Sequence, residues 1–285
     1  KNSYLYICMM NKLVNIIPKF LSEINNFSRR EVTSFAYLSI EKILGYSKSD
    51  CIIHSNHELT NDNIISFENI INDIKQNIPI QYILGEAHFY DLKFKVNSST
   101  LIPRGETEEL VQYILLHDFI SVLEIGTGSG CIAVSIAKNS NANITAIDNS
   151  IEALEIAKSN AILNSVEINF ELSDVFNFSD TKKYDLIVSN PPYVLESEKK
   201  IMNKNVLDYE PHNALFVSDN DPLIYYKEIA KIATNNLNKN GLLFFEINEK
   251  YSKQIIELLS NLNFVDIELK KDINGRDRII KSVFK

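Results

Sequence analysis

The sequence is poor in cysteine and arginine, and it lacks long apolar runs. Its three cysteines, Cys8, Cys51 and Cys131, include no CxxC pair, which argues against a disulfide framework or a structural zinc site and favours a reducing cytoplasm. No apolar run approaches the roughly 20 residues that a membrane span requires. We therefore expect a cytoplasmic protein that binds no metal and does not enter a membrane.

Acidic residues outnumber basic ones, 37 to 29. Only five residues are arginine, and the formal net charge is -8 at pH 7, so a protein that binds a long nucleic acid mainly by counterion release is disfavoured. Residues 1–10 contain neither the apolar core nor the cleavage site of a signal peptide. We expect them to be a frayed or artificial start.

The 285 residues are enough for about two domains, each with its own core. Residues 9–80 carry apolar side chains at helical spacing, whereas residues 89–97 alternate with a period of two. These patterns predict a helical N-terminal domain at 1–80, a β-hairpin connector at 81–100 and a second domain at 101–285. We interpret the helical domain as a packing domain rather than a ligand pocket.

Short apolar runs alternate with amphipathic stretches through the second domain. Such alternation predicts an α/β fold in which helices cover both faces of a mostly parallel sheet. The last two runs flank Asn274-Gly275, a dipeptide favoured in tight hairpins, so a final antiparallel strand is also predicted. The preceding apolar runs are 122–125, 144–147, 168–172, 186–188 and 242–247, and the helical patterns span 129–139, 150–163, 222–238 and 250–262.

A glycine loop follows the first of these runs and opens a helix, which is the context in which such a loop binds a nucleotide-like cofactor. Glycine allows the backbone to approach the ligand closely. A dinucleotide-binding loop would have a third glycine at position 131, where this chain has Cys131, so NAD is the weaker interpretation and Cys131 is best explained as a small buried side chain. The loop comprises Gly126, Thr127, Gly128, Ser129 and Gly130.

Three carboxylates accompany the loop. Asp148 ends the next strand, where it can accept both hydroxyls of a ribose, and Asp174 ends the third, where it can accept a hydrogen bond from an adenine amine. Either carboxylate could instead cap a helix or stabilise a loop. Glu124, directly before the loop, suits orientation of the loop and contact with the cofactor equally well.

The residues Asn190, Pro191, Pro192 and Tyr193 follow the fourth strand-like run and form a stiff turn, because proline fixes φ and lacks an N–H. The Asn190 side-chain oxygen and the Pro191 carbonyl can each accept a hydrogen of a planar NH2 group, while Tyr193 lies against that group. A turn without chemistry is the alternative. Combined with the glycine loop, this Asn-Pro-Pro-Tyr turn predicts methyl transfer to an amide or amino nitrogen.

From about residue 75 onward, the chain resembles the release factor glutamine methyltransferase family. The segments that carry the resemblance are 79–85, 101–108, 124–130, 189–193, 210–216 and 274–278, in this order and spacing. The resemblance implies a seven-stranded, Rossmann-like sheet that uses S-adenosylmethionine, preceded by a small all-α domain and a β-hairpin. The implied substrate is the glutamine of the Gly-Gly-Gln motif in peptide chain release factors.

The resemblance also implies roles for individual residues. Asn190 to Tyr193 would bind the glutamine, Gly126 to Gly130 and Asp148 would contact the cofactor, and Asp174-Val175 would flank its adenine. Arg104 and Glu106 would shape the rim of the site, although a local ion pair explains them equally well.

Two other functions remain open at this point. An adenine N6 or guanine N2 methyltransferase also presents a planar NH2 group to such a turn, but it requires an extruded base and a basic recognition segment, which this acidic chain lacks. The second alternative is a module that binds cofactor or release factor without turnover. The intact Asn190-Pro-Pro-Tyr193 sequence argues against that alternative.

Overall fold

A computed structural model describes residues 11–285, so the prediction about residues 1–10 lies outside the described part of the chain. Internal contacts divide the chain into two units, Lys1–Gly85 and Glu86–Lys285. The structure groups the hairpin of β1 (Glu86–Phe89) and β2 (Leu92–Lys95) with the second unit, because its two phenylalanines are buried in a core of that unit.

The first unit is helical, as the helical spacing of its apolar residues predicts. Capping boxes begin three of its helices: Ser28, Ser47 and Thr60 each accept a hydrogen bond from a backbone N–H three residues later. Phe20 and Phe67 meet edge to face in the core, with ring centroids 6.4 Å apart. The elements are η2 (Leu13–Asn15), α2 (Ile16–Glu23), α3 (Arg29–Leu44), α4 (Lys48–Ile53), α5 (Asn61–Lys75) and α6 (Ile80–Leu84).

A seven-stranded sheet forms the centre of the second unit, in the order β10-β11-β9-β6-β3-β4-β5. Only β11 runs against its neighbours, and Gly275 has the positive φ of 80° that its tight connection to β10 requires. The predicted antiparallel strand is thus confirmed. The strands are β3 (Ser121–Ile125), β4 (Asn143–Asp148), β5 (Asn169–Leu172), β6 (Tyr184–Ser189), β9 (Leu237–Glu246), β10 (Phe264–Lys271) and β11 (Asp277–Phe284).

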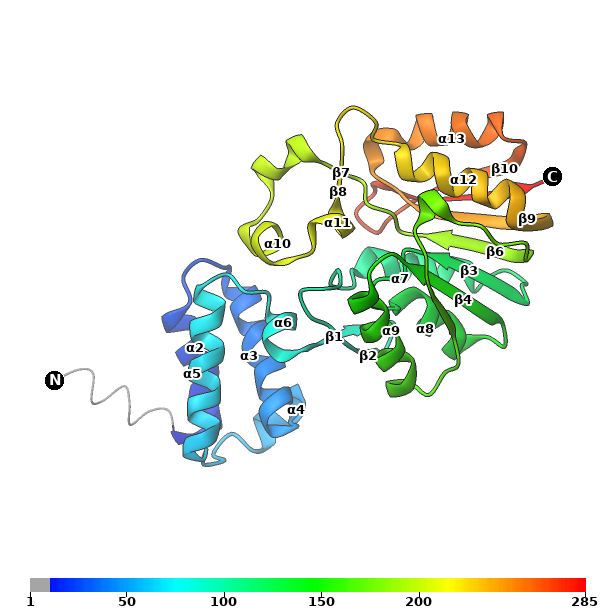
Figure 1. Ribbon diagram of the computed structural model, residues 1–285. Helices are drawn as coiled ribbons and strands as arrows, with labels where there is room; N and C mark the ends of the chain where they lie inside the picture. Colours follow the sequence, from blue (N-terminus) through cyan, green and yellow to red (C-terminus); the bar gives the residue numbers. More distant parts are fainter. Residues whose placement is uncertain (1–10) are drawn as a thin grey trace. The chain divides into compact units, whose positions relative to one another are not determined.

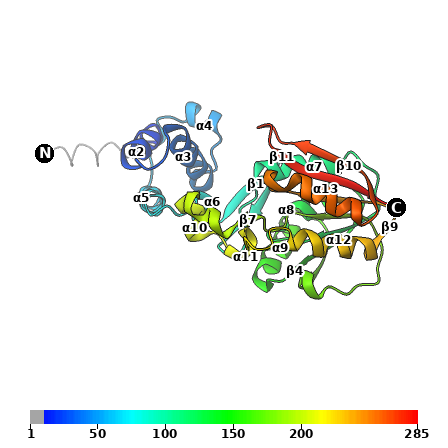
Figure 2. The ribbon, with the colours of Figure 1, turned by 90° about the horizontal axis from the view of Figure 1, so that it is seen from above.

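Helices cover both faces of this sheet, as the alternating apolar runs predict (Figure 1). Successive strand residues point to opposite faces, so Leu123 and Ile125 pack on one face while Val122 packs on the other. One face is covered by α12 (Ile224–Asn236) and α13 (Ser252–Asn261), which lie over the sheet in Figure 2. The other is covered by α7 (Gly105–Ile114), α8 (Cys131–Asn139) and α9 (Ile151–Leu163).

Shorter elements lie mainly between β6 and α12. They are η3 (Val175–Asn177), β7 (Val194–Leu195), η4 (Glu196–Ile201), α10 (Lys204–Tyr209), α11 (His212–Leu215), β8 (Phe216–Val217) and, after β9, η5 (Glu249–Tyr251). β7 and β8 pair in parallel and hold this insertion together. None of the helices within residues 11–285 combines the length and the apolar character needed to cross a membrane.

A single buried side chain, Asn160 on α9, ties the hairpin to the glycine loop. Its Oδ1 accepts the Lys95 N–H at 2.7 Å, and its Nδ2 donates to the carbonyls of Lys95 and Ser129, both at 2.9 Å. The residue is fully inaccessible to solvent. Because both donors and the acceptor are engaged, this amide fixes the loop against β2.

We expect Asn160→Ala to lower the free energy of unfolding by about 2–4 kcal/mol, since it removes the hydrogen-bond partner of one buried and two partly buried backbone groups. Urea denaturation of the whole chain measures the change. Asn141→Ala, at an exposed position, is the matched control and should change the free energy of unfolding by less than about 0.5 kcal/mol. Equal effects of the two variants would contradict this role of Asn160.

Candidate active site

The glycine loop leaves β3 at the carboxyl edge of the parallel strands and leads into α8. The N–H groups of Gly126 and Thr127 both donate to the Ile147 carbonyl, at 2.9 and 3.0 Å, which anchors the loop to β4. Gly130 has a φ of 78°, and a Cβ there would lie 3.1 Å from the Cβ of Ala157. Glycine at position 130 therefore lets α9 pack closely beneath the loop.

Asp148 joins the loop to the end of β4. Its Oδ2 accepts the Gly128 N–H at 2.8 Å, and its Oδ1 accepts the Ser150 N–H at 3.0 Å. A carboxylate has about four acceptor positions, so lone pairs remain for a ligand. Asp148 therefore holds the backbone of the loop and still presents acceptors to the cavity that it lines.

Glu124 lies beneath the loop and is almost fully buried. Its Oε2 accepts both the Thr127 hydroxyl, at 2.6 Å, and the Ala133 N–H, at 3.1 Å. Burial, with a smaller contribution from the nearby Asp148 carboxylate, raises the pKa of this carboxyl to about 8, against the effect of the two hydrogen bonds. These contacts support loop orientation, and Glu124 also lines the cavity, so the structure retains both of its predicted roles.

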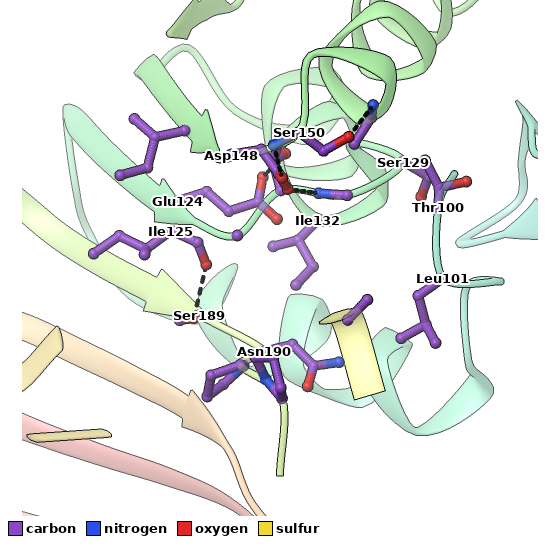
Figure 3. Close-up of a pocket in the computed structure, with 18 of the residues that line it drawn as sticks. Thr100, Leu101, Glu124, Ile125, Ser129, Ile132, Asp148, Ser150, Ser189 and Asn190 are labelled. Carbon is purple, nitrogen blue, oxygen red and sulfur yellow. Dashed lines mark hydrogen bonds between the residues drawn. The ribbon is translucent and has the colours of Figure 1, made fainter. Parts of the chain in front are cut away.

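The Asn-Pro-Pro-Tyr turn leaves β6, which lies beside β3. Ser189, the last residue of β6, pairs with Ile125, and its hydroxyl donates to the Ile125 carbonyl at 2.7 Å. The turn and the glycine loop therefore begin side by side at one edge of the sheet. Both line one cavity, as Figure 3 shows for Asn190, Asp148 and Glu124.

Most of the predicted site residues line this cavity. They are Arg104, Glu124, Gly126, Thr127, Gly128, Ser129, Asp148, Val175, Asn190, Pro191 and Pro192. Four others lie outside the lining: Glu106, Gly130, Asp174 and Tyr193. Asp174 caps η3, since its carboxylate accepts the Phe176 N–H at 3.0 Å and the Asn177 side-chain amide at 3.2 Å.

Arg104 is held by a distant partner rather than by a neighbour in its own loop. Its guanidinium contacts Glu210 at 2.6 Å, and the other oxygen of this buried carboxylate accepts the Ile102 N–H at 3.2 Å. The pair therefore joins the segment before α7 to the insertion that follows β6.

Glu246, which ends β9, has a role that the sequence patterns did not predict. This carboxylate is buried, and it accepts the Thr107 hydroxyl at 2.7 Å and the Tyr193 hydroxyl at 3.0 Å. Desolvation raises the pKa of Glu246. The Asn248 side chain also donates to the Tyr193 carbonyl, at 3.1 Å. A lone acidic residue inside an apolar strand was the available signal, because such a group needs buried partners.

The fold of this chain is similar to that of solved methyltransferases. A methyltransferase from Pyrococcus furiosus superposes with a TM-score of 0.51 and 18% identity, over 76% of this chain and 98% of that one. An rRNA methyltransferase from Thermus thermophilus superposes with a TM-score of 0.51 and 14% identity, over 70% of this chain and 50% of that one. At these identities the likeness establishes the fold, which is that of a Rossmann-like methyltransferase.

Family models and curated relatives are more specific. Residues 102–210 match the methyltransferase small domain, and residues 19–85 match the PrmC N-terminal domain. Release factor glutamine methyltransferase from Flavobacterium psychrophilum is 47% identical over 268 residues, which is 91% of this chain and 94% of the relative. The Bacteroides thetaiotaomicron protein of the same name is 41% identical over 276 residues, which is 95% of this chain and 99% of the relative. The chain belongs to the release factor glutamine methyltransferase family, which confirms the resemblance.

We expect Asp148→Ala to weaken cofactor binding by roughly tenfold or more, because it removes the acceptor of the Gly128 N–H together with the remaining lone pairs. Titration calorimetry with S-adenosylmethionine measures the dissociation constant. Glu155→Ala, at an exposed position on α9, is the matched control. An unchanged dissociation constant would contradict the prediction that Asp148 binds the ribose.

Glu124→Gln should make stability less sensitive to pH. The folded wild type keeps the Glu124 proton up to about pH 8, whereas the unfolded chain loses it near 4.5, so the wild-type free energy of unfolding falls as pH rises between these values. The glutamine lacks this titration. Between pH 5 and 8 the free energy of unfolding of the variant should rise by more than about 1 kcal/mol relative to that of the wild type, since one pKa unit corresponds to about 1.4 kcal/mol. Parallel urea-denaturation profiles for the two proteins would contradict the buried, protonated state.

Proposed function

We propose that this protein transfers a methyl group from S-adenosylmethionine to the side-chain amide nitrogen of the glutamine in the Gly-Gly-Gln motif of peptide chain release factors. The observation that carries the proposal is the single cavity lined by both the glycine loop and Asn190. Family membership supplies the reaction and the substrate class.

The residues present fit the cofactor. A Cβ placed on Gly126 or Gly128 would meet nothing within 4 Å, so the loop leaves open space for a ligand against its backbone. Asp148 offers acceptors for the ribose hydroxyls, and Val175 contributes an apolar wall for the adenine, with Asp174 beside it. When bound, S-adenosylmethionine supplies an electrophilic methyl group on a sulfonium.

The Asn-Pro-Pro-Tyr turn supplies orientation. An amide nitrogen is a poor nucleophile, because its lone pair is delocalised into the carbonyl. Two acceptors, the Asn190 Oδ1 and the Pro191 carbonyl, hold the plane of the glutamine NH2 group so that the nitrogen faces the methyl carbon. As the new C–N bond forms and the C–S bond breaks, the nitrogen gives up one hydrogen as a proton.

The other substrate contacts belong to the same proposal. Arg104, fixed by Glu210, lines the cavity and receives the backbone that flanks the glutamine, and Glu106, which lies outside the present lining, extends the rim. Tyr193 lies outside the present lining, and we assign its ring to the amide plane of the bound glutamine while its hydroxyl remains on Glu246. The release factor acts in translation, so we place the reaction in the cytoplasm; Cys51 and Cys131, both free, are compatible with that compartment.

A methyltransferase acting directly on nucleic acid is the less favoured function. The chain carries a net charge of -8, which opposes the phosphate contacts that such a substrate requires. A non-catalytic binding module is less favoured again, because Asn190, Pro191 and Pro192 all line the cavity of the glycine loop.

Methyl transfer from tritiated S-adenosylmethionine tests the proposal. We expect label on purified release factor and none on a release factor whose Gly-Gly-Gln glutamine is replaced by alanine. Label on stripped RNA or DNA would favour the nucleic-acid enzyme, and cofactor binding without any label would favour the module.

In the same assay, Asn190→Ala should reduce turnover by roughly 100-fold or more while changing the cofactor dissociation constant little, because it removes an orienting acceptor. Asn235→Ala, an exposed change on α12, should retain wild-type turnover. Near-normal turnover of Asn190→Ala would refute the role given to this side chain.

A further inference from the structure

A chain of hydrogen bonds runs from the core of the second unit to the Asn-Pro-Pro-Tyr turn. The Thr107 hydroxyl, in the first turn of α7, donates to the Glu246 Oε2 at 2.7 Å. The Asn190 Nδ2 donates in turn to the Thr107 Oγ1 at 3.4 Å. The second bond is long, as is common for catalytic groups without their substrate. Thr107 and Glu246 are both nearly inaccessible to solvent, so water does not compete for these bonds.

Which group donates in each of these hydrogen bonds follows from the number of protons available. An ionised carboxylate only accepts hydrogen bonds, and a hydroxyl has a single proton to donate. Thr107 uses its proton on Glu246, so toward Asn190 it can only accept. Asn190 must therefore turn its NH2 group toward Thr107, which leaves the Oδ1 as the atom presented to the cavity.

The second contact of Glu246 reinforces this direction. The Tyr193 hydroxyl donates to the Oε1 at 3.0 Å, so each carboxylate oxygen already receives an O–H. Desolvation raises the pKa of Glu246, and the two hydroxyls together with the positive charge of Arg278 act against that rise. In this geometry the bonds from Thr107 and Tyr193 make each carboxylate oxygen an acceptor.

The orientation matters because the two ends of an asparagine amide have nearly the same shape and opposite hydrogen-bonding character. A substrate NH2 group needs an acceptor, and a flipped Asn190 would offer it a second NH2 group. Packing alone does not distinguish the two orientations. The hydroxyl of Thr107 does.

We propose that Thr107 and Glu246 are positioning residues that set the side-chain amide of Asn190 with its oxygen toward the substrate nitrogen. This inference rests on the proposed function, since it concerns the acceptor that orients the glutamine. Thr107 and Glu246 act through Asn190 and do not themselves contact the reacting atoms.

Substitutions of Thr107 in two backgrounds test this role. Thr107→Val keeps the shape and removes the hydroxyl, and we expect it to lower kcat roughly tenfold or more, with the cofactor dissociation constant changed less than about twofold. Thr107→Ser restores the hydroxyl and should recover most of the turnover. In an Asn190→Ala background, Thr107→Val should lower kcat by less than about a further twofold, because the side-chain amide that Thr107 positions is gone.

The outcomes separate this inference from the proposed function. Label on release factor with the wild-type enzyme tests the function alone, and its absence would overturn the function and this inference together. If the wild type labels release factor but Thr107→Val slows the reaction equally in both backgrounds, only this inference is overturned. Loss of activity in Thr107→Ser would overturn it too. Thermal denaturation checks that each variant is folded, and Thr107→Ala takes the place of the valine in the same comparison if the valine variant is not.

Discussion

The parallel pairing of β3 with β6 is the constraint on which the site depends. Ile125 and Ser189 are partners in this register, and each is the last residue of its strand. The glycine loop and the Asn-Pro-Pro-Tyr turn therefore start from adjacent points, although some sixty residues separate them in sequence. A shift of the register by one residue would exchange the side chains of one strand between the two covered faces of the sheet and would move the two segments apart. The fold thus brings the proposed cofactor loop and the proposed substrate turn together before any ligand is involved.

Much of the fold could be predicted from sequence, because its signals are local. Apolar runs of three to six residues marked the strands, helical periods marked α8, α9, α12 and α13, and Asn274-Gly275 marked the last hairpin. Boundaries were less certain: the run predicted at 242–247 is the end of a strand that begins at Leu237. The polar stretch Asn238–Gly241 interrupts the apolar pattern there, and the pairing that extends the strand comes from its neighbours in the sheet.

Site residues that directly follow a strand could be predicted from the sequence. Site residues whose role depends on a partner far away in the sequence could not. Asn190, the glycine loop and Asp148 each come directly after a strand, and they line one cavity; their individual roles remain predictions. Glu246 and Glu210 could not be assigned, because their partners Thr107 and Arg104 are more than a hundred residues away. Sequence spacing contains no information about such pairs. Only the folded chain shows which buried carboxylate meets which donor.

The Asn-Pro-Pro-Tyr turn is held at both of its ends. Ser189 bonds to β3 on one side, and on the other the backbone of Tyr193 is held by Asn248 while its hydroxyl is held by Glu246. Two prolines between these points remove most of the remaining torsional freedom. The loss of conformational entropy is therefore incurred when the chain folds. In the proposed reaction, the glutamine therefore meets a turn that is already ordered, so little of its binding free energy is consumed in ordering the protein.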